Sequence, residues 1–327
     1  MLQILLVTFP FFALVLCGYL AARGRLLPLE AIPGLNTFVL FFALPCMLYR
    51  FGANTPIARL LDVSVFGTYL VCGLLLVSFT IATTLKGPNG WNDASFGALV
   101  AAFPNSGFMG MPLLVKLLGD RVAGPVIVTL TVDMVVTSSL CIALSRLGAT
   151  DKQGVGRAAL NAFRGMVKNP LPWAILLGCI SSASGLTLPL PLTNAVSMLA
   201  DAASPTALFT IGAVLARSQM TAPAAVGRRA RIGDVPQVVL YKLILHPALV
   251  FGLGTLAIAL GLPLDPYALT VLVLVAALPS ASNVPMLAER FGADTGRVAR
   301  IVLVSTTLAF LTFSAAVALA MRSAPLQ

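Results

Sequence analysis

Two short stretches of the chain decide its fold. Residues 102–112 read AFPNSGFMGMP, and residues 277–285 read ALPSASNVP. Each stretch places two prolines around small and amide residues in the middle of a long apolar run. Proline removes a backbone donor and clashes with the carbonyl four residues earlier, so both runs should be helices that are interrupted near their centres. The prolines expected to break them are Pro104, Pro112, Pro279 and Pro285.

The rest of the chain is strongly apolar. Of its 327 residues, 58% are hydrophobic and 10% are charged, and the mean hydropathy is +0.97. A soluble domain carries roughly 25% charged residues, so lipid must be the solvent for most of this chain. We predict an all-α integral membrane protein with ten transmembrane helices, because ten apolar windows have about the length that crosses a ~30 Å hydrocarbon core. They lie near residues 3–22, 34–51, 64–85, 95–117, 122–145, 170–186, 193–216, 236–260, 267–288 and 299–321.

The basic residues indicate the topology. The first, third, fifth, seventh and ninth loops hold 16 of the 21 Lys and Arg residues, and the other loops and the C-terminus hold 5. Positive loops stay cytoplasmic, so both termini should face outward, which requires an even number of spans. Because these charges are divided among short loops rather than gathered in a patch, the net charge of +10 does not indicate nucleic-acid binding.

The polar linker at residues 147–169 divides the chain into residues 1–146 and 170–327, each with five spans. An odd number of spans makes the two halves enter the membrane in opposite directions, which is the condition for an inverted repeat. The interrupted helices are then helices 4 and 9, and they should cross near the midplane. The half-helix that begins after each break points its free amides inward, where they can hold an anion.

Polar side chains beside the breaks are the candidate ligands. Asparagine supplies amide donors and serine supplies a hydroxyl donor. The expected substrate-binding residues are Asn105, Ser106, Gly107, Ser280, Ser282 and Asn283.

Two acidic residues within spans are candidates for ion coupling. Asp133 lies near the centre of the fifth span, where a charge costs about 3 kcal/mol, so it either takes part in coupling or bonds to a neighbouring helix. Asp201 precedes Pro205 by one helical turn and has either a coupling or a structural hydrogen-bonding role. We expect Lys242 to extend its amine to the cytoplasmic surface and His246, one turn deeper, to pack or to bond the backbone.

No cofactor or metal site is expected. The five cysteines lie within apolar stretches and form no CxxC motif, so neither a disulfide framework nor a zinc site is indicated. Walker A, HExxH and Rossmann motifs are absent from the sequence, which argues against an enzyme or an ATP-driven pump. An intramembrane aspartyl protease could use Asp133 and Asp201, but the YD and GxGD patterns are missing at both positions.

Several stretches resemble the auxin efflux carrier family. Residues 104–112, PNSGFMGMP, resemble the crossover motif of that family, and residues 278–292, LPSASNVPMLAERFG, resemble its partner in the second half. Residues 36–45, NTFVLFFALP, resemble its second span, and residues 201–205, DAASP, with Gly212 resemble its seventh. The resemblance covers essentially the whole chain and is greatest to the bacterial branch with malonate-permease-like proteins.

The resemblance implies a fold like those of NhaA and the bile-acid symporters. Helices 1, 2, 6 and 7 would form a scaffold that is often a homodimer interface, and helices 3–5 and 8–10 would form a transport domain. A small carboxylate would bind at the crossover and move by an elevator mechanism, in the inner membrane of a bacterium with both termini periplasmic. Leu44 and Cys46 flank Pro45 where the plant members have polar residues, so the substrate should be smaller than auxin.

The coupling ion stays open at this point. Proton coupling is favoured, since a sodium site needs carboxylate and carbonyl oxygens and the breaks carry asparagine and serine. Plant members have a glutamine at the place of Asp133, which makes this acid a departure from their pattern. The alternative is a sodium-coupled organic-anion symporter of the bile-acid type.

Overall fold

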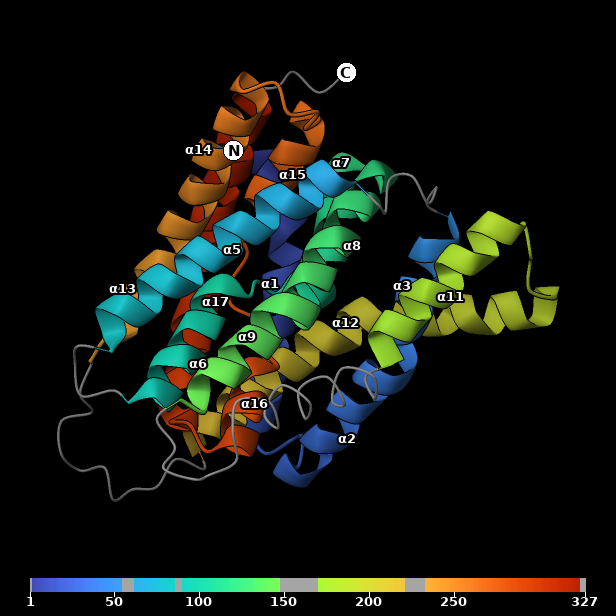
Figure 1. Cartoon of the computed structure of the whole chain (residues 1–327). Helices are drawn as coiled ribbons and strands as arrows, with labels where there is room; N and C mark the ends of the chain where they lie inside the picture. Colours follow the sequence, from blue (N-terminus) through green and yellow to red (C-terminus); the bar gives the residue numbers. More distant parts are fainter. Residues whose placement is uncertain (1, 55–61, 86–89, 148–169, 221–232, 324–327) are drawn as a thin grey trace.

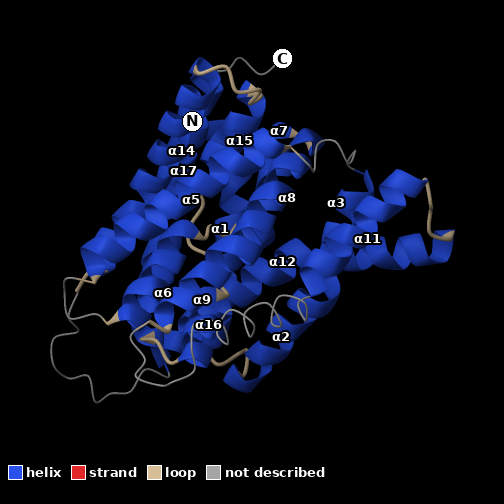
Figure 2. Ribbon diagram, viewed as in Figure 1, coloured by secondary structure: helices blue, strands red, loops and turns tan. Residues whose placement is uncertain are grey.

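The computed structural model describes residues 2–54, 62–85, 90–147, 170–220 and 233–323. Within these ranges the chain is helical between short turns and contains no β-strand, as Figure 2 shows. The predicted linker at 147–169 lies outside the described residues except for its first position.

The first half of the chain forms eight described α-helices. They are α1 (Leu2–Arg23), α2 (Ile32–Phe38), α3 (Leu44–Asn54), α5 (Val63–Thr84), α6 (Trp91–Ala102), α7 (Met111–Leu118), α8 (Ala123–Thr131) and α9 (Ser138–Ser145). Wide π-helical turns link some of them, namely η2 (Val39–Ala43), η3 (Ser106–Gly110) and η5 (Val132–Thr137). Short 3-10 turns, η1 (Leu29–Ala31) and η4 (Asp120–Val122), precede α2 and α8.

The second half forms seven described α-helices and one π-helical turn, η6 (Tyr241–Leu245). The helices are α11 (Pro170–Ser184), α12 (Leu190–Met220), α13 (Val235–Leu240), α14 (His246–Ala259), α15 (Pro266–Ala276), α16 (Val284–Phe291) and α17 (Thr295–Ser323). Each of the ten apolar windows falls on helical residues, and the windows at 95–117 and 267–288 are interrupted.

Six helical segments of the described chain are long and apolar enough to cross a membrane: Leu29–Asn54, Val63–Thr84, Asp120–Ser145, Leu190–Arg217, Val235–Ala259 and Thr295–Ala320. Four shorter apolar helices, Phe9–Arg23, Ser106–Leu118, Trp173–Ser184 and Pro266–Ala276, fall in the other four windows. The described part of the chain is therefore all-helical, as in a multi-pass membrane protein.

Glycines bring α1 and α12 into backbone contact. A Cβ atom on Gly18 would lie 1.9 Å from the carbonyl oxygen of Phe209, and one on Gly212 would lie 1.8 Å from that of Val15. No side chain fits at either position, so the two helices pack at the short distance that small residues allow in membranes.

A second glycine crossing joins α3 and α11. A Cβ atom on Gly178 would lie 2.5 Å from the carbonyl oxygen of Tyr49, and one on Gly52 would lie 3.0 Å from that of Ile175. In both crossings the first predicted span of one half meets the second span of the other half. Because α12 also packs on α3, these four helices form one group.

The remaining helices form a second group. Helix α5 packs on α6 and α14, α6 packs on α9, α14 packs on α15, and α16 packs on α17. Figure 1 shows this group on one side of the molecule and α3 with α11 on the other, with α12 lying between them.

Three of the π-helical turns end two residues before a proline. These prolines are Pro45 after η2, Pro112 after η3 and Pro247 after η6. The proline ring would clash with the carbonyl four residues back, which lies inside the wide turn in each case. Widening the turn lets the helix continue past the proline.

A buried ion pair ties three helix starts together at one end of the bundle. Arg297 Nε donates to Asp234 Oδ1 over 2.8 Å, and Arg297 Nη1 donates to the backbone carbonyl of Asp93 over 2.7 Å. A Cβ atom on Gly97 would lie 2.5 Å from Arg297 Nη2, so this glycine makes room for the guanidinium. Arg297 is thus not a free loop charge, and the starts of α6, α13 and α17 meet at this end.

Candidate substrate site

The two interruptions lie side by side at the centre of the molecule. The backbone amide of Asn105 donates to the carbonyl of Pro279 over 2.8 Å, and the amide of Ala281 donates to the carbonyl of Phe103 over 2.9 Å. These bonds form an isolated antiparallel bridge between the breaks. Each break therefore satisfies backbone groups that the other leaves without a helical partner.

The local sequence explains how the first break forms. Helix α6 ends at Ala102, and Phe103 is extended, with φ −98° and ψ 99°. This is the conformation that a residue before proline favours, and Phe103 is followed by Pro104. Asn105 then begins the turn η3, which leads into α7.

The four predicted break prolines have two different positions. Pro104 and Pro279 lie in the gaps, between α6 and η3 and between α15 and α16. Pro285 lies in the first turn of α16, where a missing amide proton costs nothing because it has no helical acceptor. Pro112 follows the wide turn η3, with which the second half-helix begins at Ser106. Both prolines lie within the second half-helices and do not interrupt them.

Buried polar atoms gather at the crossover. Asn105, Ser106 and Ser280 are all buried, and Asn105 Oδ1 and Ser280 Oγ have no hydrogen-bond partner within the described residues. Leaving such atoms unpaired costs about 1–3 kcal/mol each. The Ser106 hydroxyl makes only a long bond of 3.4 Å to the carbonyl of Pro104. The crossover can therefore accept further hydrogen bonds from a molecule that enters it.

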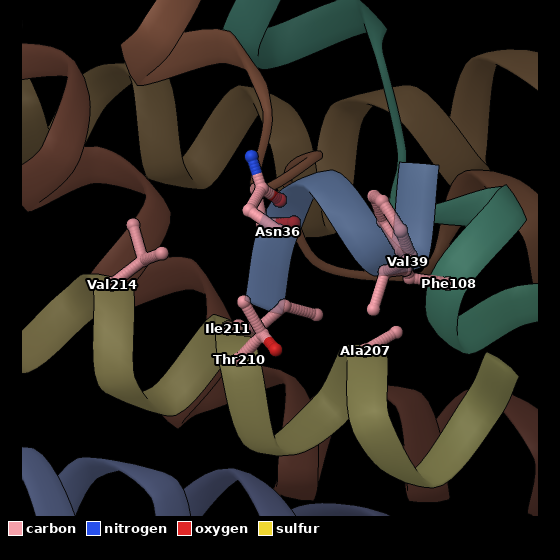
Figure 3. A pocket seen from close by; sticks show the side chains of 8 residues that line it. Asn36, Val39, Phe108, Ala207, Thr210, Ile211 and Val214 are labelled. Carbon is pink, nitrogen blue, oxygen red and sulfur yellow. The ribbon is translucent and has the colours of Figure 1, made fainter. Parts of the chain in front are cut away.

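A narrow cavity lies beside the breaks, between the two helix groups. Its volume is about 10 Å³, which is room for about one water molecule. Figure 3 shows Asn36 and Val39 above the labelled residues of α12, with Phe108 at one side and the amide nitrogen of Asn36 pointing away from α12. The lining residues are Asn36, Val39, Phe108, Ala207, Thr210, Ile211, Val214 and Ser282. Any carboxylate larger than water must widen this cavity to enter.

The other predicted ligands also lie at the crossover. Ser282 lines the cavity, and the backbone carbonyl of Asn283 accepts a bond of 3.3 Å from Leu287 at the start of α16. Gly107 is not required for space, since a Cβ atom there would meet Leu130 at an ordinary 3.5 Å. The structure thus brings all six predicted binding residues together.

Asp133 lies behind the crossover and is buried. Tyr69 donates its hydroxyl to Asp133 Oδ2 over 3.1 Å, and the Thr137 hydroxyl lies 3.4 Å from Oδ1. The carboxylate therefore bonds to α5 and to its own π-helical turn, and it does not line the cavity.

The expectation for Lys242 is wrong. Its side chain is fully buried, and Nζ donates to the carbonyl of Ala276 over 2.9 Å. Ala276 is the last residue of α15, so the amine caps the half-helix that leads into the second break, where a cation is favoured. The charges of Lys242 and Asp133 also lie close enough to interact.

His246 packs inside the same region. Its Nδ1 lies 3.0 Å from Lys242 Nζ, and its ring centroid lies 6.0 Å from that of Tyr69. Its Nε2 has no hydrogen-bond partner within the described residues. We call Tyr69, Asp133, Lys242 and His246 the buried charge cluster.

Asp201 lies elsewhere. Its side chain is 71% exposed and pairs with Arg50 over 2.8 Å between α12 and α3. The structure therefore gives Asp201 an exposed ion pair and separates it from the crossover and from Asp133. The side chains of Glu289 and Arg290 lie outside the described part of the chain.

The sequence did not predict some residues of the site. Asn36 and Thr210 line the cavity, and Tyr69 and Lys242 complete the buried charge cluster. Lys242 left a usable signal, because it lies seven residues inside its window and has the opposite charge to Asp133. Intramembrane ionisable residues usually pair, so two such residues in separate windows predict contact.

Comparison with known proteins identifies the family of the chain. The model of a family described as "Membrane transport protein" matches residues 4–317. The chain is 32% identical to the "Putative malonate transporter" of Rhizobium meliloti (strain 1021) over 93% of this chain and 91% of that protein. It is 25% identical to the "Uncharacterized transporter YfdV" of Escherichia coli (strain K12) over 88% of each chain. It is 22% identical to "Auxin efflux carrier component 8" of Arabidopsis thaliana over 75% of this chain and 79% of that protein. Because the family match spans nearly the whole sequence, the chain belongs to the membrane transport protein family of the auxin efflux carriers.

Proposed function

We propose that the protein is a secondary transporter of a small organic anion, with malonate or a similar carboxylate bound where the two breaks cross. The observation that carries the proposal is the pair of buried, unpartnered atoms, Asn105 Oδ1 and Ser280 Oγ, beside a cavity at a hydrogen-bonded crossover. The name of the relative from Rhizobium meliloti supports the choice of malonate as the first substrate to test.

The crossover chemistry suits a carboxylate. The Asn105 amide presents either its oxygen or its nitrogen to the site after a 180° flip, and the serine hydroxyls can donate. The first-turn amides of Gly107 and Phe108 have no acceptor within their own half-helix, and the helix dipole adds positive potential there. A carboxylate would therefore meet several donors without a fixed positive side chain.

We propose ten spans in two inverted repeats, with α1, α3, α11 and α12 in the scaffold. The two equivalent glycine crossings support the repeat, and the position of the cavity between α2, α12 and the breaks supports movement along this boundary. In this mechanism the second helix group slides as an elevator and carries the crossover with it. The scaffold would also form a homodimer in a bacterial inner membrane, with both termini periplasmic.

We propose protons as the coupling ions, with Asp133 as the coupling residue. Its buried carboxylate bonds to Tyr69 on one side and interacts with Lys242 on the other, so a change in its charge alters contacts within the moving group. Sodium is the alternative, in which case oxygen atoms of the breaks would coordinate the ion.

Uptake of labelled malonate into proteoliposomes tests the proposal. With an inward proton gradient, we expect wild type to take up more malonate than protein-free liposomes do. We expect Asn105→Ala to take up no more than protein-free liposomes. Uptake driven only by a sodium gradient would identify sodium, and not the proton, as the coupling ion. Absence of carboxylate uptake under any gradient would refute the transport function.

The coupling residue has a separate test. Asp133→Asn should change the pH dependence of uptake, and the double variant Asp133→Asn/Lys242→Met keeps the buried charges balanced if the single variant is unstable. An unchanged pH profile in the folded variant would return Asp133 to a structural role.

A further inference from the structure

An apolar groove runs along the outside of the molecule between α12, α13 with η6, and α17. Its volume is about 690 Å³, far larger than that of the cavity at the crossover. Leu240, Ile244 and Leu308 line it and are each more than 40% exposed. In a membrane protein such a surface faces lipid, and its concave shape favours an ordered chain over a mobile one.

The polar residues that line the groove are Gln219, Arg300 and Thr312, and of these Arg300 carries a charge. Arg300 lies near its end, five residues after the start of α17, and forms no hydrogen bond or ion pair with the described part of the chain. The groove continues along α17 to Thr312, twelve residues and roughly 18 Å further. Half of the hydrocarbon core is ~15 Å thick, so the groove has about the length of one leaflet.

The cation lies at the end where anionic headgroups are found. Helices α13 and α17 both begin there, close to the Asp234–Arg297 pair, and this is the end with the predicted cytoplasmic loops. Basic pockets between transmembrane helices on this side bind anionic lipid headgroups. A guanidinium also binds phosphate oxygens in a bidentate manner, which fixes the headgroup more firmly than charge alone.

We propose that this groove binds one anionic phospholipid, with its phosphate on Arg300 and an acyl chain along α17 towards Thr312. The site is separate from the crossover, and its occupancy does not depend on transport. The lipid lies between α12 and the helices of the second group, where it fills the boundary on the membrane side.

Native mass spectrometry of the full chain in mild detergent tests this proposal. With equal amounts of dioleoyl phosphatidylglycerol and dioleoyl phosphatidylcholine added, we expect wild type to retain phosphatidylglycerol preferentially. Arg300→Gln should reduce this retention roughly fivefold, the factor that one basic residue near an anionic surface contributes. Arg300→Lys should keep part of it, and Arg25→Gln, which removes an exposed charge outside the groove, should keep all of it.

A groove-filling variant tests the acyl chain separately. Val304→Trp places a large side chain in the groove at a position that is already 37% exposed, and it should reduce the retention of both lipids. Equal retention of the two lipids by wild type, or unchanged retention of phosphatidylglycerol by a folded Arg300→Gln variant, would overturn the proposal. Loss of a dimer mass without loss of lipid in Val304→Trp would assign the groove to a second copy of the chain instead.

Discussion

Lys242 Nζ lies 3.0 Å from His246 Nδ1, with both side chains fully buried in the membrane-spanning part of the chain. The same amine holds the carbonyl of Ala276, where α15 ends before the second break. The amine of Lys242 thus connects the eighth predicted span to the crossover. Its position gives the buried charge cluster a structural task in addition to any task in coupling.

Removing this amine should destabilise the protein strongly. Lys242→Met leaves the buried carbonyl of Ala276 without its donor, so we expect a loss of about 1–3 kcal/mol in stability. Thermal unfolding in detergent measures it. The double variant Lys242→Met/Asp133→Asn should unfold at a higher temperature than Lys242→Met, and equal unfolding temperatures would show that the two charges do not interact.

Ser280→Ala should weaken malonate binding by roughly 10- to 100-fold, since a hydrogen bond to a charged group contributes about 1.5–3 kcal/mol. Its stability should change little, because the hydroxyl oxygen has no partner to lose. Ser95→Ala is the matched control, since Ser95 Oγ is also buried and unpartnered but lies in α6 outside the break. Equal binding by both variants would remove Ser280 from the site.

Asn105→Ala and Asn283→Ala should each abolish malonate binding without unfolding the protein. Equilibrium binding by isothermal titration, with unfolding temperature as the folding control, distinguishes the two effects. Asn105 is buried and Asn283 is half-buried, so the Asn105 variant should be affected at least as much. Wild-type affinity in both variants would exclude the crossover as the substrate site.

The glycine crossings predict position-specific effects on stability. Gly212→Ala forces a Cβ atom against the backbone of Val15, which cannot withdraw as a flexible side chain can, so we expect a loss of about 3 kcal/mol or more. Gly252→Ala in α14 meets nothing within 4 Å and should gain up to about 1 kcal/mol from helix propensity. A comparison of the two unfolding temperatures checks the prediction, and similar values would contradict the close packing of α1 and α12.

The two ion pairs should differ in strength. Arg297→Met breaks a pair whose side chains are 6% and 13% exposed, and about 3–5 kcal/mol should be lost. Arg50→Met breaks the Arg50–Asp201 pair, with side chains 32% and 71% exposed, and about 0–1 kcal/mol should be lost. Chemical denaturation of both variants tests this order. Added salt should leave the loss of stability from Arg297→Met unchanged.

The breaks were predictable because proline acts through local sterics. Pro104 and Pro279 lack an amide proton wherever they stand in a helix, so their effect can be deduced without knowing any neighbouring helix. The same rule was incomplete for Pro112 and Pro285, since it does not distinguish a proline within a gap from one inside the next half-helix. The crossing of the two interrupted helices was expected from their matching positions in the two halves, but the hydrogen-bonded bridge between the breaks was not.

The positions of ionisable side chains were not predictable in the same way. An apolar window gives depth along the helix axis but not the direction in which each side chain points. Lys242 was expected at the surface but lies in the interior, because α15 ends next to it with an unpaired carbonyl. Asp201 points outward because Arg50 of α3 stands beside it, and that contact depends on the glycine packing of other helices.

The bridge between the breaks also has a consequence for biogenesis. The amide of Ala281 bonds the carbonyl of Phe103, and 178 positions separate these residues in the chain. Ribosomes add ~5–20 residues per second, so the first break enters the membrane roughly 10–35 s before its partner exists. During that interval the unpaired amide and carbonyl groups of the first break need other hydrogen-bond partners, either water or polar groups of an insertase. The insertion machinery must therefore supply these hydrogen-bond partners to the first break until the second half has been synthesised.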